Sequence, residues 1–143
     1  MTLVDTNVLL DIARDDAVWF AWSSARLNER AAWGPLLIND VVYAEVSATF
    51  EQMEETEAFL RGAGLKLERT PRPALFLAAR AHLRYRRRGG TRHGVLSDFF
   101  IGAHAAVRGL PLLTRDPRRY RDYFPALRVI APEPLPPAGS GPH

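Results

Sequence analysis

The 143-residue sequence contains no cysteine, which excludes disulfide bonds and thiolate metal sites. It also lacks any uncharged run long enough to cross a bilayer. Its first residues, MTLVDTNVLL, do not show the basic segment followed by a long apolar segment that marks a secretory leader. From these absences we expect a soluble protein of the cytoplasm.

Lysine is almost missing, because Lys66 is the only one and arginine supplies every other basic side chain apart from histidine. The formal net charge is +3. The planar guanidinium group matches the geometry of phosphate, so a nucleic-acid partner is consistent with this composition. A genomic base bias toward Arg, Ala, Leu and Pro explains it equally well, and composition alone leaves the choice open.

A chain of this length can bury one adequate core, and its 47% hydrophobic content argues against general disorder. Short apolar segments alternate with amphipathic stretches, a pattern typical of a parallel sheet in a three-layer α/β fold. The predicted strands are Thr2–Val4, Trp33–Ile38, Leu65–Glu68, Leu110–Leu113 and Leu127–Ile130. The predicted helices are Thr6–Ala13, Ala17–Arg30, Asp40–Phe50, Glu51–Gly62, Pro73–Arg88, Asp98–Arg108 and Pro117–Asp122.

The last residues, APEPLPPAGSGPH, are rich in proline and glycine. Such a composition cannot bury enough apolar surface to fold and predicts a disordered tail. We therefore expect one folded domain over residues 1–131 and a tail over residues 132–143.

Two acidic residues follow predicted strands directly. Asp5 comes after the first strand, and Asp116 comes after the fourth, in LLTRDPRRY. Open parallel sheets bind ligands beyond the carboxyl ends of their strands, so these two side chains are candidates for one shared crevice. Each of them also suits the cap of the helix that follows, which is the ordinary alternative.

Two further acids lie on predicted helices. Glu45, in NDVVYAEVSATF, stands at the edge of an apolar face, where a carboxylate is rare unless it is paired or bound to a metal. Pairing with an arginine or reaching out to water are the alternatives. Asp98 opens a helix with Ser97 as the expected cap and suits the helix dipole. It shares its face with Ile101 and Gly102, so its side chain should point inward.

Four ionised carboxylates in one crevice would repel one another. Two of them about 5 Å apart repel by about 3 kcal/mol at an effective dielectric near 20, so the cluster would need protons or cations. No cysteine or histidine cluster accompanies them, and oxygen ligands alone favour Mg²⁺ or Mn²⁺. Such an ion can activate a water for attack on a phosphodiester. The spacing permits this convergence without establishing it.

Four segments, VDTNVLLDIA, VVYAEV, LSDFFIGAHA and LLTRDPRRY, resemble in this order the acidic motifs of PIN domains. More narrowly they resemble VapC-type ribonuclease toxins of bacterial toxin–antitoxin pairs, over residues 2–130. The resemblance implies a Rossmann-like α/β/α fold and a Mg²⁺- or Mn²⁺-dependent endoribonuclease. It also implies a homodimer and a cognate antitoxin that blocks the cleft.

By motif match, the resemblance assigns roles to individual residues. The catalytic, metal-binding acids would be Asp5, Glu45, Asp98 and Asp116, with Asp5 and Asp98 as the main ligands. Thr6, Asn7 and Thr114 would orient these carboxylates. Asn39 stands where many relatives carry serine or threonine, and we interpret it as an equivalent helix cap.

A dense basic segment, RAHLRYRRRGGTRH, predicts a surface that grips RNA phosphates. A solvated helix end, whose positive charge complements the dipole, is the alternative. A second basic group lies next to Asp116 and is predicted to steady either substrate phosphates or the cleft itself; it consists of Arg115, Arg118, Arg119 and Arg121. The residues predicted to contact RNA are Arg84, Arg87, Arg88, Arg92 and Arg115.

Several remaining residues are predicted to be structural. We interpret the carboxylates of Asp11, Asp15, Asp16 and Asp40 as surface or capping groups. The aromatic side chains of Trp19, Phe20 and Trp22 are expected in the core rather than on a dimer or antitoxin surface.

Competing functions remain. A haloacid-dehalogenase-like phosphatase needs a second acid where Asn7 stands, and a receiver domain needs a late lysine, whereas Lys66 is mid-chain. A non-catalytic RNA-binding module of the same fold is a stronger rival, although an idle acidic cluster would only destabilise it. A housekeeping RNA-processing nuclease is the third alternative, and the small size of the chain favours the toxin over it.

Overall fold

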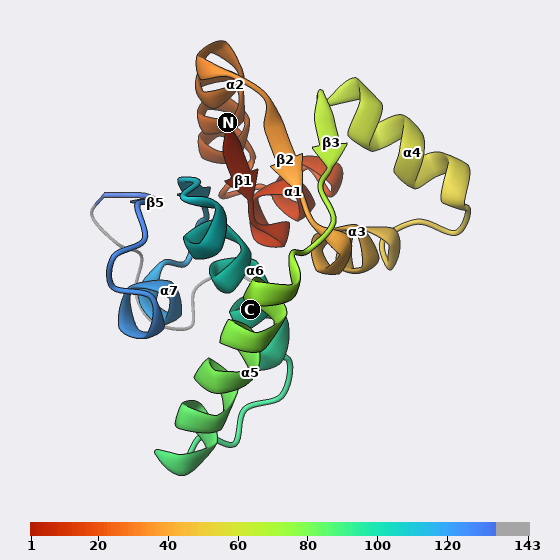
Figure 1. The fold of residues 1–143 in the computed structure, drawn as a ribbon. Helices are drawn as coiled ribbons and strands as arrows, with labels where there is room; N and C mark the ends of the chain where they lie inside the picture. Colours follow the sequence, from red (N-terminus) through yellow and green to blue (C-terminus); the bar gives the residue numbers. More distant parts are fainter. Residues whose placement is uncertain (134–143) are drawn as a thin grey trace.

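The structure is a computed structural model that describes residues 1–133. Its strands pair in parallel to form one sheet in the order β3-β2-β1-β4-β5 (Figure 1). The strands are β1 (Thr2–Val4), β2 (Leu36–Ile38), β3 (Leu65–Leu67), β4 (Leu112–Leu113) and β5 (Val129–Ile130). The predicted tail lies outside the described residues, except for its first two positions.

Helices connect the strands and cover the sheet. They are α1 (Thr6–Ala13), α2 (Phe20–Trp33), α3 (Asp40–Ser47), α4 (Met53–Gly62), α5 (Arg72–Arg87), α6 (Val95–Arg108) and α7 (Arg118–Tyr123). The chain runs from β1 outward through β2 to β3 and then returns to the other side of β1 with β4. Because crossovers between parallel strands are right-handed, the helices before and after this reversal cover opposite faces of the sheet. The predicted α/β/α fold with a five-stranded parallel sheet is confirmed.

The centre of the sheet is buried on both faces because its strands are unbroken apolar runs. Leu3, Val4, Ile38 and the two residues of β4 are fully buried. Each such side chain contributes roughly 1.5–3 kcal/mol relative to an exposed position. β1 and β4 are neighbours in this rigid centre. The segments that follow the two strands therefore begin at fixed positions next to each other, which matters for the site described below.

Some predicted boundaries differ from the structure. The first long helix starts at Phe20 and continues through Trp33, so the second strand is limited to Leu36–Ile38. The predicted cap at Ser97 is wrong, because α6 already begins at Val95 after a left-handed Gly94. The Ser97 hydroxyl instead donates to the Gly94 carbonyl. Asp98 nevertheless lies in the first turn of α6.

Other local predictions have mixed outcomes. The Asn39 cap is confirmed, since its side-chain oxygen accepts the Val42 N–H at 3.1 Å. Trp22 packs against the core and forms an edge-to-face pair with Trp19, but Phe20 is 38% exposed, so a core position for all three aromatics is wrong. In the part of the chain that the structure describes, no helix has the length and apolar character needed to cross a membrane.

Candidate functional site

A pocket of about 860 Å³ lies beyond the carboxyl ends of β1 and β4 and is lined by all four predicted acids. Asp5 caps α1, Glu45 lies on α3, Asp98 on the first turn of α6, and Asp116 in the segment between β4 and α7. The Asp5 N–H donates to the Leu113 carbonyl at 2.9 Å, which ties the ends of β1 and β4 together. The structure therefore brings together acids that are up to 111 positions apart in the sequence.

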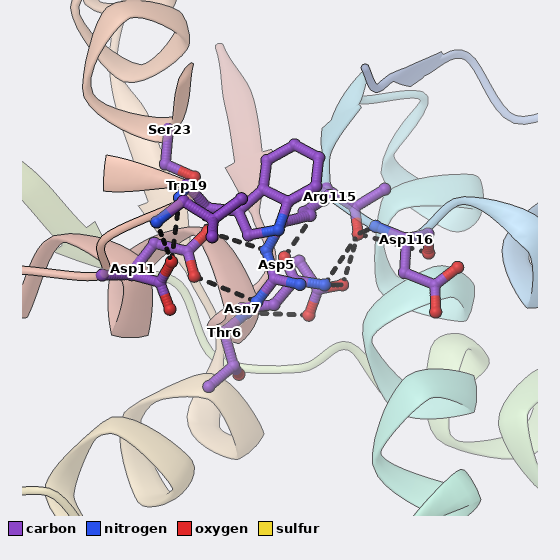
Figure 2. Close-up of polar contacts among 11 residues, drawn as sticks. Asp5, Thr6, Asn7, Asp11, Trp19, Ser23, Arg115 and Asp116 are labelled. Carbon is purple, nitrogen blue, oxygen red and sulfur yellow. Dashed lines mark hydrogen bonds and ion pairs between the residues drawn. The ribbon is translucent and has the colours of Figure 1, made fainter. Parts of the chain in front are cut away.

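The Asp5 carboxylate is held by several donors. It is 5% exposed, and its Oδ1 accepts the Thr6 N–H at 2.7 Å. Its Oδ2 accepts the hydroxyls of Thr114 (2.8 Å) and Tyr120 (2.9 Å). The side-chain amide of the neighbouring Asn7 donates more weakly to the same oxygen, at 3.4 Å (Figure 2). Asn7 also donates to Thr114 Oγ1 at 3.3 Å. These contacts fix the direction of the carboxylate.

The Glu45 carboxylate is held by Thr6, the first residue of α1. The Thr6 hydroxyl donates to Glu45 Oε1 at 2.6 Å, across the contact between α1 and α3. Thr6 thus serves two acids, one through its main chain and one through its side chain. The predicted supporting residues all lie in contact with predicted acids.

The electrostatics of the pocket reflects this crowding of negative charge. Burial, followed by the charges of Asp98 and Glu45, raises the pKa of Asp5 to about 7, against the lowering effect of its hydroxyl donors. The pKa of Asp98 is raised by burial and by Glu45 and Asp116, while Arg119 opposes the increase. The carboxylates are therefore close enough to penalise one another's ionisation.

Two arginines compensate part of this charge. Arg119 Nη1 lies 2.7 Å from Asp98 Oδ2, and Arg118 Nη1 lies 3.1 Å from Asp116 Oδ1. Both arginines line the pocket together with Arg92. The predicted second basic group therefore includes two side chains that belong to the site itself.

The donor set fits a hard divalent cation, because it consists of carboxylate oxygens that carry more negative charge than the arginines neutralise. Within residues 1–133, no three acidic or histidine side chains are grouped as a ready-made metal site. Asp98 and Asp116 are each engaged by an arginine in this arrangement. Binding an ion would require Asp98 to exchange at least part of its contact with Arg119.

Sequence reasoning missed Tyr120. Its ring is fully buried and its hydroxyl contacts Asp5, while burial and the nearby acids raise its pKa well above the usual value. Its hydroxyl therefore remains a proton donor at any physiological pH. The close approach of α7 to α6 is possible because Gly102 has no side chain: a Cβ there would lie 2.5 Å from the Phe124 ring. The only signal for Tyr120 was an aromatic residue four positions after Asp116.

The arginines predicted to contact RNA are in different places. Arg92 lines the pocket, whereas Arg84 and Arg88 fasten the end of α5 to α7. Arg84 donates to the Tyr123 carbonyl at 3.4 Å, and Arg88 lies 3.7 Å from Asp122. Arg87 is exposed in the last turn of α5.

Two predictions about buried charges are wrong. Arg115 was predicted to contact RNA, but it is 1% exposed and donates through Nε and Nη2 to both carboxylate oxygens of Asp11, at 2.8 and 3.0 Å (Figure 2). Asp11 was predicted to be a surface or capping group, but it is equally buried and paired with Arg115. Asp11 follows Asn7 by four positions and therefore lies on the same face of α1. This spacing is the signal in the sequence that could have placed Asp11 on the inside.

A family model described as PIN domain matches residues 2–124 of the chain. Solved structures with a similar fold include VapBC2 of Rickettsia felis bound to a fragment of promoter DNA, at 15% identity and a TM-score of 0.69, covering 92% of this chain and 98% of that one. DNA-bound VapBC of Salmonella typhimurium gives 18% identity, a TM-score of 0.66 and coverages of 91% and 96%.

A toxin–antitoxin complex of Klebsiella pneumoniae is also similar in fold, at 22% identity and a TM-score of 0.59, covering 91% of this chain and 96% of that one. A comparison with curated proteins found no significant match. At these identities the solved structures establish the likeness of the fold.

Proposed function

The chain belongs to the PIN domain family, and from that premise we propose that it is a divalent-metal-dependent endoribonuclease. Proteins of this family are nucleases. The observation that supports the proposal is the pocket in which Asp5, Glu45, Asp98 and Asp116 converge and raise one another's cost of ionisation. A bound cation would offset the repulsion between these ionised carboxylates.

Asp5 and Asp98 would be the main ligands of Mg²⁺ or Mn²⁺, and Glu45 and Asp116 would bind it directly or through water. When bound, the ion would supply an activated water and neutralise charge on the scissile phosphate. Asp5 is suited to its role because four donors hold its carboxylate in one direction. Thr6 holds Glu45 in the same way.

The arginines of the pocket wall would contact the RNA. Arg92, Arg118 and Arg119 surround the acids, and a guanidinium can bind phosphate with two parallel hydrogen bonds. Without such cations a pocket of four acids would repel a polyanion. This arrangement supports a nucleic-acid substrate more directly than the overall charge of the chain does.

We infer further that the nuclease is the toxin of a toxin–antitoxin pair. The support is the fold it shares with the VapBC complexes of Rickettsia felis and Salmonella typhimurium and with the toxin–antitoxin complex of Klebsiella pneumoniae. The partners would be a cognate antitoxin protein and a second copy of the chain, and the site of action would be the cytoplasm. A housekeeping RNA-processing nuclease of the same family is the second candidate, since the acidic pocket would serve it equally.

Cleavage of a mixed cellular RNA pool tests the nuclease proposal. Purified protein with Mg²⁺ or Mn²⁺ should yield discrete fragments, and both EDTA and Asp98→Asn should abolish them. Asp40→Asn is the matched control, because it makes the same chemical change at an exposed acid on the helix that carries Glu45. If the protein cuts no RNA under either metal, or if Asp98→Asn cuts as well as wild type, the catalytic assignment fails and a non-catalytic RNA-binding module becomes the better reading.

Expression in bacteria tests the toxin proposal separately. Wild-type protein should arrest growth, Asp98→Asn should not, and co-expression of a short reading frame adjacent to the gene should restore growth. Light scattering after gel filtration reports whether the chain is a dimer alone and what it forms with that partner. Active protein that leaves growth unaffected would favour the housekeeping nuclease.

A further inference from the structure

The most deeply buried ion pair outside the acidic pocket joins Asp11 of α1 to Arg115, the residue between Thr114 and Asp116. The side chains are 1% and 2% exposed, and both guanidinium–carboxylate contacts are about 3 Å or shorter. The Ser23 hydroxyl donates to Asp11 Oδ2 at 2.7 Å, and the guanidinium carbon lies 5.3 Å from the centre of the Trp19 ring (Figure 2). Both carboxylate oxygens of Asp11 and the Nε and Nη2 atoms of Arg115 are paired, and the two side chains have little access to water.

Such a pair is not explained by stability alone. Removing two charges from water costs several kcal/mol per ion, and apolar side chains of similar volume often stabilise a core as well or better. A buried pair is better suited to fixing geometry, because a planar guanidinium bound through two hydrogen bonds permits little rotation. The contacts of Arg115 identify the part of the site that this pair holds in place.

Arg115 is held to α1 at two levels. Its backbone N–H donates to the Asn7 side-chain oxygen at 3.1 Å, and its guanidinium binds Asp11, one helical turn further along α1. The same Asn7 contacts Thr114, and the Asp116 N–H donates to Thr114 Oγ1 at 3.2 Å. One face of α1 therefore fixes the whole segment between β4 and α7.

The consequence falls on Asp116. In Figure 2 the side chains of Arg115 and Asp116 leave the chain toward opposite sides, Arg115 toward Asp11 and Asp116 away from it. Anchoring the first of two consecutive side chains on α1 determines where the second one points. Asp5 caps the start of α1, and Asp116 directly follows Arg115. The ion pair between α1 and Arg115 therefore also fixes the position of Asp116 relative to Asp5.

We propose that Asp11 and Arg115 are a positioning pair that orients Asp116 toward the pocket. The pair does not touch substrate; it acts through the segment that it holds. The proposal rests on the nuclease function insofar as Asp116 is one of the functional acids. Of the two roles predicted for the basic group that contains Arg115, the proposal favours support of the cleft over contact with RNA. The two roles differ in effect, because an RNA-contacting arginine would act on substrate binding and a positioning arginine acts on turnover.

The double variant Asp11→Leu/Arg115→Met tests this role, since it removes both charges and leaves apolar side chains of similar size. We expect kcat to fall between about tenfold and 100-fold, in line with a misplacement of about 1 Å, with KM unchanged. Arg115→Lys, which keeps the charge and loses the planar fork, should retain more activity than Arg115→Met. Arg108→Met is the matched control, because it removes an ion pair with Glu68 at the far end of α6 from Asp98.

Amide NMR supplies a readout that does not depend on activity. In the double variant, the Asn7 side-chain amide and the Asp116 backbone amide should shift, while both should stay unchanged in Arg108→Met. If they coincide with wild type, or if a folded double variant keeps its kcat, the positioning role is refuted. If KM rises and kcat is unchanged, Arg115 acts on RNA and the proposal is equally refuted.

The test also covers a double variant that does not fold and a wild-type protein that cleaves no RNA. Should the double variant fail to fold, Asp11→Asn and Arg115→Lys take its place, and wild-type kcat together with wild-type amide positions in both would refute the proposal. Should wild-type protein cleave no RNA at all, the nuclease proposal fails on its own, and the amide shifts still decide whether the pair orients Asp116.

Discussion

The Asp5 carboxyl should make the metal-free protein less stable as the pH rises through the physiological range. Burial and the neighbouring acids raise the pKa of Asp5 from 3.8 to about 7 in the folded state. A folded state with the higher pKa binds more protons than the unfolded chain between these two values. The free energy of unfolding therefore decreases with pH across this window and levels off above pH 7.

The size of the effect follows from the shift. A difference of about three pKa units corresponds to about 4 kcal/mol once Asp5 is fully ionised. Roughly a third of this is already lost at pH 5, so the decrease between pH 5 and pH 8 should be about 3 kcal/mol. The raised pKa of Asp98 acts in the same direction. The lowered pKa of Glu68 acts oppositely, but chiefly at a pH below its ordinary value of 4.5.

Urea denaturation in EDTA at pH 5, 6, 7 and 8 measures this decrease. Asp5→Asn should flatten the profile, because the group that titrates is gone. Saturating Mn²⁺ should also flatten the wild-type profile, because an ion would hold Asp5 ionised in the folded state. A wild-type stability in EDTA that is constant or increases from pH 5 to pH 8 would refute the placement of Asp5 in a crowded acidic pocket.

Other changes in and around the pocket have distinct expected outcomes. Tyr120→Phe removes the hydroxyl that donates to the buried, charged Asp5 carboxylate. It should lower the free energy of unfolding at pH 8, measured in urea, by about 1.5–3 kcal/mol. It should also lower kcat, because Asp5 is less firmly held. Arg119→Gln should weaken RNA binding and make the dependence of log K on log salt shallower by about 0.7 if this side chain binds one phosphate of a single strand, as measured by filter binding. Gly102→Ala should destabilise the protein by about 1–3 kcal/mol, because its Cβ would overlap an aromatic ring of the α7 region. Gly62→Ala is its control in a thermal melt, since nothing lies near the added Cβ and the melting temperature should hold or rise.

The positions of the acids could be predicted because they depend on the order of strands and helices. Asp5 and Asp116 each follow an apolar run, and parallel pairing of β1 with β4 brings such positions to one edge of the sheet. Glu45 and Asp98 could be placed from helical periodicity, even though the start of α6 was predicted three residues late. Ser97 misled that prediction because a serine before an aspartate is typical of a helix cap, whereas the helix begins after a left-handed glycine.

The arginine and tyrosine partners of the acids could not be predicted in the same way. Arg115, Arg118 and Arg119 are close in sequence, but only Arg115 is buried. Arg115 lies in the segment before α7, which has no regular period that assigns a side chain to the inside or the outside, whereas Arg118 and Arg119 begin α7. The role of Tyr120 depends on how closely α7 approaches α6, which is a matter of tertiary packing. Sequence patterns and motif matches therefore identified where charge is placed and three of the residues that hold it, Thr6, Asn7 and Thr114, whereas the roles of Tyr120, Arg118 and Arg119 followed only from the structure.

The four acids are held in two different ways, and the difference has a consequence for metal binding. Asp5 and Glu45 are oriented by neutral donors, which can remain in place when a cation arrives because they also stabilise an ionised carboxylate. Asp98 and Asp116 are engaged by arginines, which compete with a cation for the same oxygens. The first pair would then provide a preformed half of a metal site, and the second pair would complete it once its carboxylates were released from the arginine contacts. The released guanidinium groups of Arg118 and Arg119 would remain at the pocket wall, where the negative charge of an RNA phosphate would replace that of the carboxylates.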